Sequence, residues 1–127
     1  MITPKENKQN FIMNKIKIIL GNSKIEAFHF KTTFRLILGL MFRKDGNALL
    51  EFRKERKPKI WTLFMRYPLN LVFLDRNKKI VDLIEEVPPI SFNPKTWKTY
   101  CPRKKCKYAL ELDARKRIKI DSKIEFI

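Results

Sequence analysis

Short runs of β-branched and aromatic residues, separated by turn formers, recur along this chain and constrain its fold more than any other feature. The first run is KIKIIL, starting at Lys15, and the second is KIEAFHF, ending at Phe30. Gly21, Asn22 and Ser23 lie between them. Two such runs joined by a few turn formers predict a β-hairpin.

Further runs of the same kind predict strands over residues 48–52, 60–65, 69–74, 80–84, 108–112 and 118–126. The last of these alternates apolar with polar residues, which is typical of a half-buried strand. A basic loop is expected over residues 53–59. Asp75–Lys78 is expected to form a turn, in which Asn77 is the residue able to take a left-handed conformation. An irregular stretch is expected from Val87 to about Lys107, because residues before proline avoid helix.

One segment carries a helical pattern. Thr32 or Thr33 can cap it, and Gly46 follows its end. Its apolar residues at i, i+3, i+4 and i+7 are Phe34, Ile37, Leu38 and Met41. The fold is therefore predicted to be α+β and mainly β. We expect a compact, strongly curved sheet or partly closed barrel of about eight short strands with one packed helix.

The chain length of 127 residues fits a single domain. Residues 1–12 are polar and lack periodicity, so we expect a flexible tail there and one globular domain over residues 13–127. The longest apolar stretch is interrupted by Arg66, Pro68 and Asn70, so no spanning helix and no membrane partner are expected. Two cysteines are too few for a disulfide framework, which indicates a cytoplasmic protein.

Basic residues greatly outnumber acidic ones: 29 minus 13 gives a net charge of +16. Either an anionic partner or a compositional bias could explain this excess. Three segments, residues 53–59, 103–107 and 115–119, carry +4 each. Such clusters, with aromatic residues nearby for stacking, are typical of RNA and single-strand binders. The candidate contact residues are Arg53, Lys54, Arg56, Lys57, Lys59, Trp97, Tyr100, Arg103, Lys104, Lys105, Lys107, Arg115, Lys116, Arg117 and Lys119.

Catalytic and metal sites are weakly indicated. His29 alternates with Ile25 and Ala27, which favours a half-buried, hydrogen-bonded strand residue over a catalytic base. One histidine and two cysteines cannot complete a four-ligand zinc site. Cys106 is expected in the core, whereas Cys101 lies in a basic stretch that could lower its thiol pKa. Three glycines exclude the common phosphate-binding loops. We expect no cofactor and no metal, and an enzyme is the less favoured class.

Several motifs in order resemble the uncharacterised protein family 0127, also called domain of unknown function 192. They are GLMFR (39–43), ALLEF (48–52), FMRYPLNLVFLD (64–75), EEVPPI (85–90) and YALEL (108–112). The resemblance covers about residues 13–127 and implies a small β-rich fold of archaea and bacteria, with no activity to carry over. The family's Pro-Leu-Asp is Pro68-Leu69-Asn70 here, so chemistry that needs that acid is not expected.

Two functions from different classes remain open. The first is a non-catalytic basic module that binds RNA or single-stranded DNA. The alternative is a scaffold domain for a small ligand or a protein partner, without a nucleic-acid role. Its pocket would be walled by Met41, Phe64 and Met65, beside a proline-rich flap over residues 87–94. The location of the three basic segments on the fold is the observation that separates them.

Overall fold

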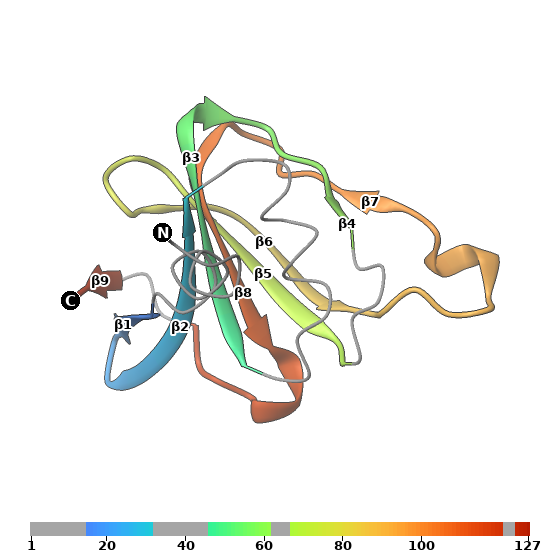
Figure 1. Ribbon diagram of the computed structural model, residues 1–127, viewed down its shortest axis with the longest axis horizontal. Coiled ribbons are helices and arrows are strands. Elements are labelled where there is room, and N and C mark those ends of the chain that lie inside the picture. Colours follow the sequence, from blue (N-terminus) through green and yellow to red (C-terminus); the bar gives the residue numbers. More distant parts are fainter. Residues whose placement is uncertain (1–14, 32–45, 62–66, 121–123) are drawn as a thin grey trace, which may run out of the picture.

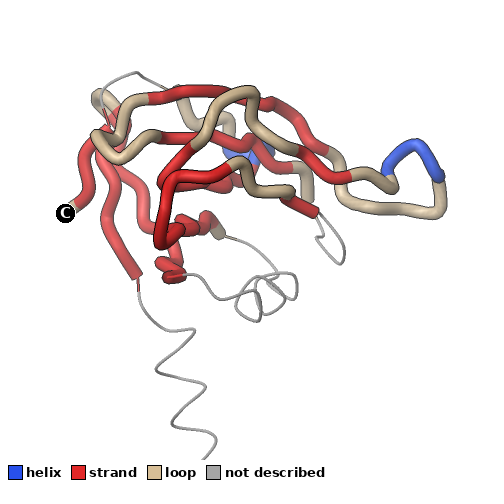
Figure 2. Tube along the Cα trace, turned by 90° about the horizontal axis from the view of Figure 1, so that it is seen from above, coloured by secondary structure: helices blue, strands red, loops and turns tan. Residues whose placement is uncertain are grey.

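Seven strands form one curled, open sheet (Figures 1 and 2). The computed structural model describes residues 15–31, 46–61, 67–120 and 124–127. In sheet order the strands are β6 (Ile80–Val87), β5 (Leu69–Leu74), β8 (Cys106–Asp113), β3 (Asn47–Arg56), β2 (Ser23–Lys31), β1 (Lys15–Leu20) and β9 (Ile124–Phe126). Two short strands, β4 (Ile60–Trp61) and β7 (Thr99–Tyr100), pair separately. The prediction of a mainly β fold with a strongly curved sheet is confirmed.

The expected packed helix falls on residues 32–45, which lie outside the described residues. Within the described ranges the helical elements are two three-residue 3-10 turns, η1 (Pro94–Thr96) and η2 (Ala114–Lys116). None of the helices among these residues is long and apolar enough to cross a bilayer.

Strands that are neighbours in the sequence form an antiparallel hairpin at the N-terminal end, but the next pairing is parallel. The hairpin is confirmed, since β1 and β2 pair antiparallel from Leu20–Ser23 outward and Gly21 takes a positive φ of 60° at the turn. β2 then pairs parallel with β3, whereas the other pairs within the sheet are antiparallel. The chain therefore crosses over between β2 and β3 before it enters the centre of the sheet.

Both faces of the central strands are buried. One core cluster includes buried or partly buried residues from all seven strands, with Leu49, Val72 and Leu110 at its centre. A second cluster lies on the opposite face and includes Leu50 and Phe73 together with residues of β4 and β7. In β5, Leu69, Leu71 and Phe73 belong to one cluster and Val72 and Leu74 to the other, and all six residues of the strand are buried. A strand buried on both faces is expected to be apolar almost throughout, and LNLVFL is apolar apart from Asn70.

Three local predictions were wrong. Residues 53–56 continue β3 and do not belong to a loop. In the turn after β5 the left-handed residue is Lys78, with a φ of 65°, and not Asn77. The turn is held by Asp75, whose Oδ1 accepts from the backbone N–H groups of Asn77 and Lys79. The last strand is β9 alone, because η2 and the left-handed Arg117 interrupt the chain after β8.

Candidate functional site

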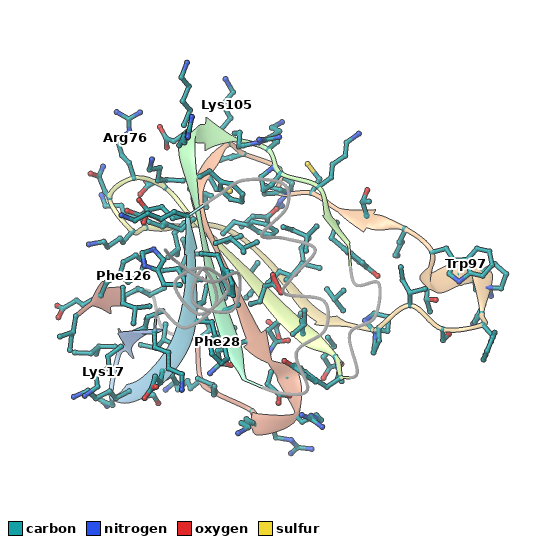
Figure 3. The ribbon with its side chains drawn as sticks, viewed as in Figure 1. Lys17, Phe28, Arg76, Trp97, Lys105 and Phe126 are labelled. Carbon is teal, nitrogen blue, oxygen red and sulfur yellow. The ribbon has the colours of Figure 1, made fainter. Side chains whose placement is uncertain are left out.

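Basic side chains gather at the end of the sheet where β3 ends and β8 begins, around a groove of about 620 Å³. They come from three segments distant in sequence: the end of β3, the turn between β5 and β6, and the start of β8. Figure 3 shows Arg76 and Lys105 at this same end of the molecule. We call this site the basic groove; it is lined by Arg53, Lys54, Glu55, Arg76, Lys105 and Lys107.

A bulge in β3 exposes the first wall of the basic groove. Glu51 pairs with Tyr108, and the next pair is Arg56 with Cys106, so the register shifts between them. Four residues of β3 therefore oppose a single residue of β8. A bulge of this kind bends the strand and redirects side chains out of the regular alternation. Arg53 and Lys54 are consequently both exposed, although they are neighbours on one strand.

Two contacts hold the walls together. Lys107 Nζ donates a hydrogen bond to the backbone oxygen of Arg53 at 2.8 Å, which ties the bulge to β8. Arg76 Nε and Nη2 both donate to Glu55 Oε1, at 3.0 and 2.9 Å. The second contact joins the β5–β6 turn to β3. Exposed ion pairs contribute little to stability, so the main effect is to position Arg76 beside the groove.

The basic groove carries five cations and one carboxylate, a net charge of +4. The one carboxylate, Glu55, is already paired with Arg76. Clefts lined by one sign of charge concentrate counter-ions and speed the approach of oppositely charged ligands. The arrangement therefore suits a ligand with several anionic groups.

Arg103, in the second basic segment, is bound to a buried acid. Its backbone N–H donates to Asp82 Oδ2 at 2.8 Å, and its Nε and Nη2 donate to Oδ1 at 3.2 and 3.0 Å. Burial raises the pKa of Asp82, but the hydrogen bonds from Arg103 and from the Leu83 backbone outweigh it, so the net pKa lies below its ordinary value. Arg103 thus holds the loop before β8 against β6, while Lys104 and Lys105 stay exposed.

The third basic segment lies at the opposite end of the sheet. β8 runs antiparallel to β3, and the Asp113 backbone N–H donates to Asn47 Oδ1 at the start of β3. Eight residues at about 3.4 Å each put roughly 25 Å between the two ends of β8. Segment 115–119 therefore does not share a surface with the basic groove.

Arg115 of this third segment is also engaged. Its Nε and Nη2 donate to the buried carboxylate of Asp113, at 3.0 and 2.8 Å. This side-chain hydrogen bond is the main reason that the pKa of Asp113 lies below its ordinary value. The Arg115 guanidinium also lies 4.6 Å from the centre of the Tyr67 ring. Lys116, Arg117 and Lys119 remain exposed.

The predicted stacking residues lie away from the basic groove. Figure 3 shows Trp97 at the tip of a projecting segment, far from Arg76 and Lys105. Tyr100 is half-buried in β7, and burial raises the pKa of its hydroxyl. Neither ring lines the groove. The structure thus brings together four of the predicted residues, Arg53, Lys54, Lys105 and Lys107, while Arg56, Lys57 and Lys59 are exposed on the chain that follows the bulge.

Arg76 is the lining residue that sequence reasoning missed. It belongs to an isolated turn, DRNK, whose basic character is weak beside the three clusters. The turn reaches the groove because β5 pairs with β8, which pairs with β3. A search for single basic residues at hairpin turns would have found Arg76, but only the strand order shows which turns adjoin the cluster.

The remaining chemical candidates are one histidine and two cysteines. His29 is half-buried, and its Nε2 lies 2.8 Å from Glu51 Oε1 on the neighbouring strand, as the alternation pattern predicted. Cys106 is buried in the core, and this burial raises its thiol pKa to about 12. Cys101 is exposed. Among the described residues, no group of three or more histidine, cysteine or acidic side chains could hold a metal ion.

Two buried polar side chains, Glu111 and Asn70, lie in the central strands of the sheet. Glu111 is buried, 5% exposed, in the centre of β8 between Ala48 and Leu71. Asn70, where the resembling family has an acid, is 9% exposed. Its Oδ1 accepts from the backbone N–H of Glu86 at 2.8 Å. This hydrogen bond sits where the β5–β6 register shifts.

Comparisons with known proteins agree with this fold. The profile of DUF192, described as "Uncharacterized ACR", matches residues 17–126. The UPF0127 protein of Pyrococcus abyssi (strain GE5 / Orsay) is 31% identical over 124 residues, which is 91% of this chain and 97% of that protein. The UPF0127 protein of Pyrococcus furiosus is 32% identical over 91 residues, covering 69% of this chain and 72% of that protein.

Two crystal structures share the fold at low sequence identity. One is a protein of Sinorhizobium meliloti 1021 named as a "putative transcription regulator", with a TM-score of 0.65 and 20% identity over 88% of this chain and 92% of that one. The other is a protein of unknown function from Novosphingobium aromaticivorans, with a TM-score of 0.64 and 15% identity over 87% and 83% of the two chains. These likenesses concern the fold alone.

Proposed function

We propose that this chain, which belongs to the DUF192 family of uncharacterised proteins, is a non-catalytic module that binds RNA or single-stranded DNA along the basic groove. The observation that carries the proposal is the convergence of cations from three separate segments on one groove of about 620 Å³. Folding does not require this convergence, because exposed like charges repel one another.

A nucleic-acid backbone fits the chemistry of the basic groove. Lysine and arginine side chains bind phosphate oxygens, and such contacts supply most of the affinity in binding that does not depend on sequence. A single strand can follow a concave surface formed by strand ends and turns. Reading of the duplex major groove usually needs a helix or a two-stranded β-ribbon, and no lining residue of the groove lies on a helix.

The first test is a titration with a short labelled RNA and the matching DNA, followed by fluorescence anisotropy at several salt concentrations. Four neutralised phosphates on a single strand predict a slope of about −3 in a plot of log affinity against log salt. Affinity should therefore fall roughly 50-fold between about 50 and 200 mM salt. Absence of binding at low salt, or binding that salt does not weaken, would refute the proposal.

A matched pair of double variants locates the site. Lys54→Gln with Lys105→Gln removes two charges from the basic groove and should halve the salt slope. Lys116→Gln with Lys119→Gln removes the same charge from the opposite end of the sheet and should leave the slope nearly unchanged. Equal losses from both pairs would mean that the charge acts diffusely and that the groove is not the site.

The alternative, a scaffold domain for a small ligand or a protein partner, stays a prediction. Its proposed pocket walls, Met41, Phe64 and Met65, lie outside the described residues. The basic groove itself differs from small-molecule pockets, which are lined mostly by apolar and aromatic side chains. We also propose a cytoplasmic setting, supported by two cysteines that are both free thiols.

A further inference from the structure

A projecting segment presents two large aromatic side chains to solvent. We call residues 88–98 the arm; it runs between β6 and β7 and extends away from the seven-stranded sheet (Figures 1 and 2). Phe92 is fully exposed and Trp97 is 60% exposed. Ile127, at the other end of the described chain, is comparably exposed. Large aromatic side chains that lie exposed on the same short segment can form an apolar patch of the kind that marks an interaction site.

Hydrogen bonds within the arm hold the backbone of its tip. The Asn93 side chain caps η1 by accepting from Lys95 N, and the Thr96 hydroxyl donates to the Asn93 carbonyl at 2.8 Å. Thr96 Oγ1 also accepts from the backbone N–H of Ser91 at 2.9 Å. Three prolines, at positions 88, 89 and 94, further restrict the backbone. The backbone that carries the two aromatic rings is thus restrained before any partner binds.

Several polar groups at the tip are hydrogen-bonded within the arm. Trp97 Nε1 donates to the backbone oxygen of Ser91 at 2.6 Å, so the single polar atom of the indole already has its partner. The Ser91 hydroxyl accepts from the Asn93 backbone N–H at 3.2 Å. These hydrogen bonds lie within the arm, so they are kept when the tip enters a less polar medium. These groups therefore do not add the free-energy cost of burying an unpaired polar atom.

The charge around the aromatic rings selects an anionic surface. Residues 87–107 contain six basic residues and no acidic residue. Two of them, Lys95 and Lys98, flank Trp97, and both are exposed. Aromatic rings that sit at the level of lipid headgroups, with lysines directed to the phosphates, are typical of protein segments that bind the bilayer interface.

We infer that the arm tip is a membrane-contact site, in which Phe92 and Trp97 enter the headgroup region of an anionic bilayer and Lys95 and Lys98 bind lipid phosphates. Our expectation of no membrane partner came from the lack of a spanning segment, and a surface contact of this kind needs none. The inference is independent of the basic groove, from which Trp97 is far removed (Figure 3).

The test uses the full chain and vesicles of phosphatidylcholine and phosphatidylglycerol in about a 2:1 ratio, with pure phosphatidylcholine vesicles for comparison. We expect co-sedimentation with the anionic vesicles and a blue shift of tryptophan emission that disappears in Trp97→Phe. Phe92→Ala and Trp97→Ala should each weaken vesicle binding about tenfold. Both rings are exposed, so an unchanged melting temperature is the check that the variants fold.

Matched controls separate insertion from simple adhesion of a basic protein. Phe92→Ala with Trp97→Ala leaves the net charge unchanged, so adhesion through charge alone predicts full vesicle binding by this variant, a result that would overturn the inference. If this variant keeps its vesicle affinity and loses RNA affinity instead, the rings stack on bases and the inference is equally wrong. Lys54→Gln with Lys105→Gln should weaken RNA binding and halve its salt slope while keeping the emission shift with vesicles.

Discussion

Replacement of Asn70 by alanine should destabilise the domain through a single hydrogen bond. The Asn70 side chain is 9% exposed, and its Oδ1 accepts from the backbone N–H of Glu86 at 2.8 Å. Glu86 has a φ of 53° and lies where the pairing shifts from Leu69–Val87 to Leu71–Ile84. At this bulge the Glu86 N–H is directed to a side chain and not to the neighbouring strand.

The expected loss follows from what alanine leaves behind. A buried donor without a partner costs about 1–3 kcal/mol, and partial access of water at an edge bulge places this case near 1–2 kcal/mol. For a chain of 127 residues, each kcal/mol shifts the melting temperature by about 4 °C, so Asn70→Ala should melt about 4–8 °C lower. Thermal unfolding followed by far-UV circular dichroism measures this shift.

Asn70→Asp is the control, and it restores the acid of the family pattern. A carboxylate oxygen accepts the same hydrogen bond, so this variant should melt within about 2 °C of the parent. The reasoning fails if the Asn70→Ala variant has the melting temperature of the parent, or if Asn70→Asp lowers the melting temperature as much as Asn70→Ala does. The first result would mean that water replaces the side chain, and the second that the Asn70 amide nitrogen is what matters.

Two further predictions concern the chain end and pH. Removal of residues 1–12, which lie outside the described residues, should leave the melting temperature unchanged. Removal of residues 1–20 deletes β1, the partner of both β2 and β9. This longer deletion should lower the free energy of unfolding by several kcal/mol, as measured by chemical denaturation. A large drop in melting temperature for the shorter deletion would show that residues 1–12 pack against the domain. The pKa of Asp82 is lowered in the folded protein, so the ionised carboxylate stabilises the fold fully at pH values above its ordinary pKa, near 4. This stabilisation is lost as the pH falls through the lower pKa of the folded state. Denaturation midpoints between about pH 6 and 2 should therefore fall less steeply for Asp82→Asn, and parallel curves would contradict the role of Arg103.

Local patterns were sufficient to predict most of the strands. The hairpin of β1 and β2 and the buried strands β5 and β8 are encoded by runs of β-branched, aromatic and aliphatic residues next to turn formers. The half-burial of His29 followed from the same alternation. In each case the residues that determine the structure are neighbours in the sequence.

The errors arose where hydrogen bonding between distant segments decides the outcome. Residues 53–56 read as a loop because they are charged, yet pairing of Arg56 with Cys106 continues the strand. Ile118 and Ile120 do pack against the core, as the alternation in 118–126 indicated, but they lie outside any strand. The burial of these two residues was predictable from the alternation, but the absence of strand pairing was not, because the left-handed conformation of Arg117 redirects the chain.

The candidate site was predictable only in part for the same reason. Clustering in the sequence identified Arg53, Lys54, Lys105 and Lys107 as basic, but three equivalent clusters gave no order of importance. The order β5-β8-β3 brings two clusters and Arg76 together and leaves the third at the other end of the sheet. Strand order depends on the energy of the whole sheet, so no single segment carries that information.

The pairing of β1 with β9 bears on how this protein reaches its folded state. Ile18 lies opposite Phe126, and the Ile127 backbone N–H donates to the Lys17 carbonyl at 2.8 Å, so residues more than a hundred positions apart complete the edge of the sheet. Closing so long a loop is slow, and it is rewarded only after the intervening strands have assembled. Until β9 pairs with it, the β1 edge of the early β1–β2 hairpin is unpaired. In this form the hairpin can pair with a strand edge of another molecule. Lys15, Lys17 and Lys24 lie along this hairpin. Repulsion between these lysines on different chains would keep the unpaired edge free for β9.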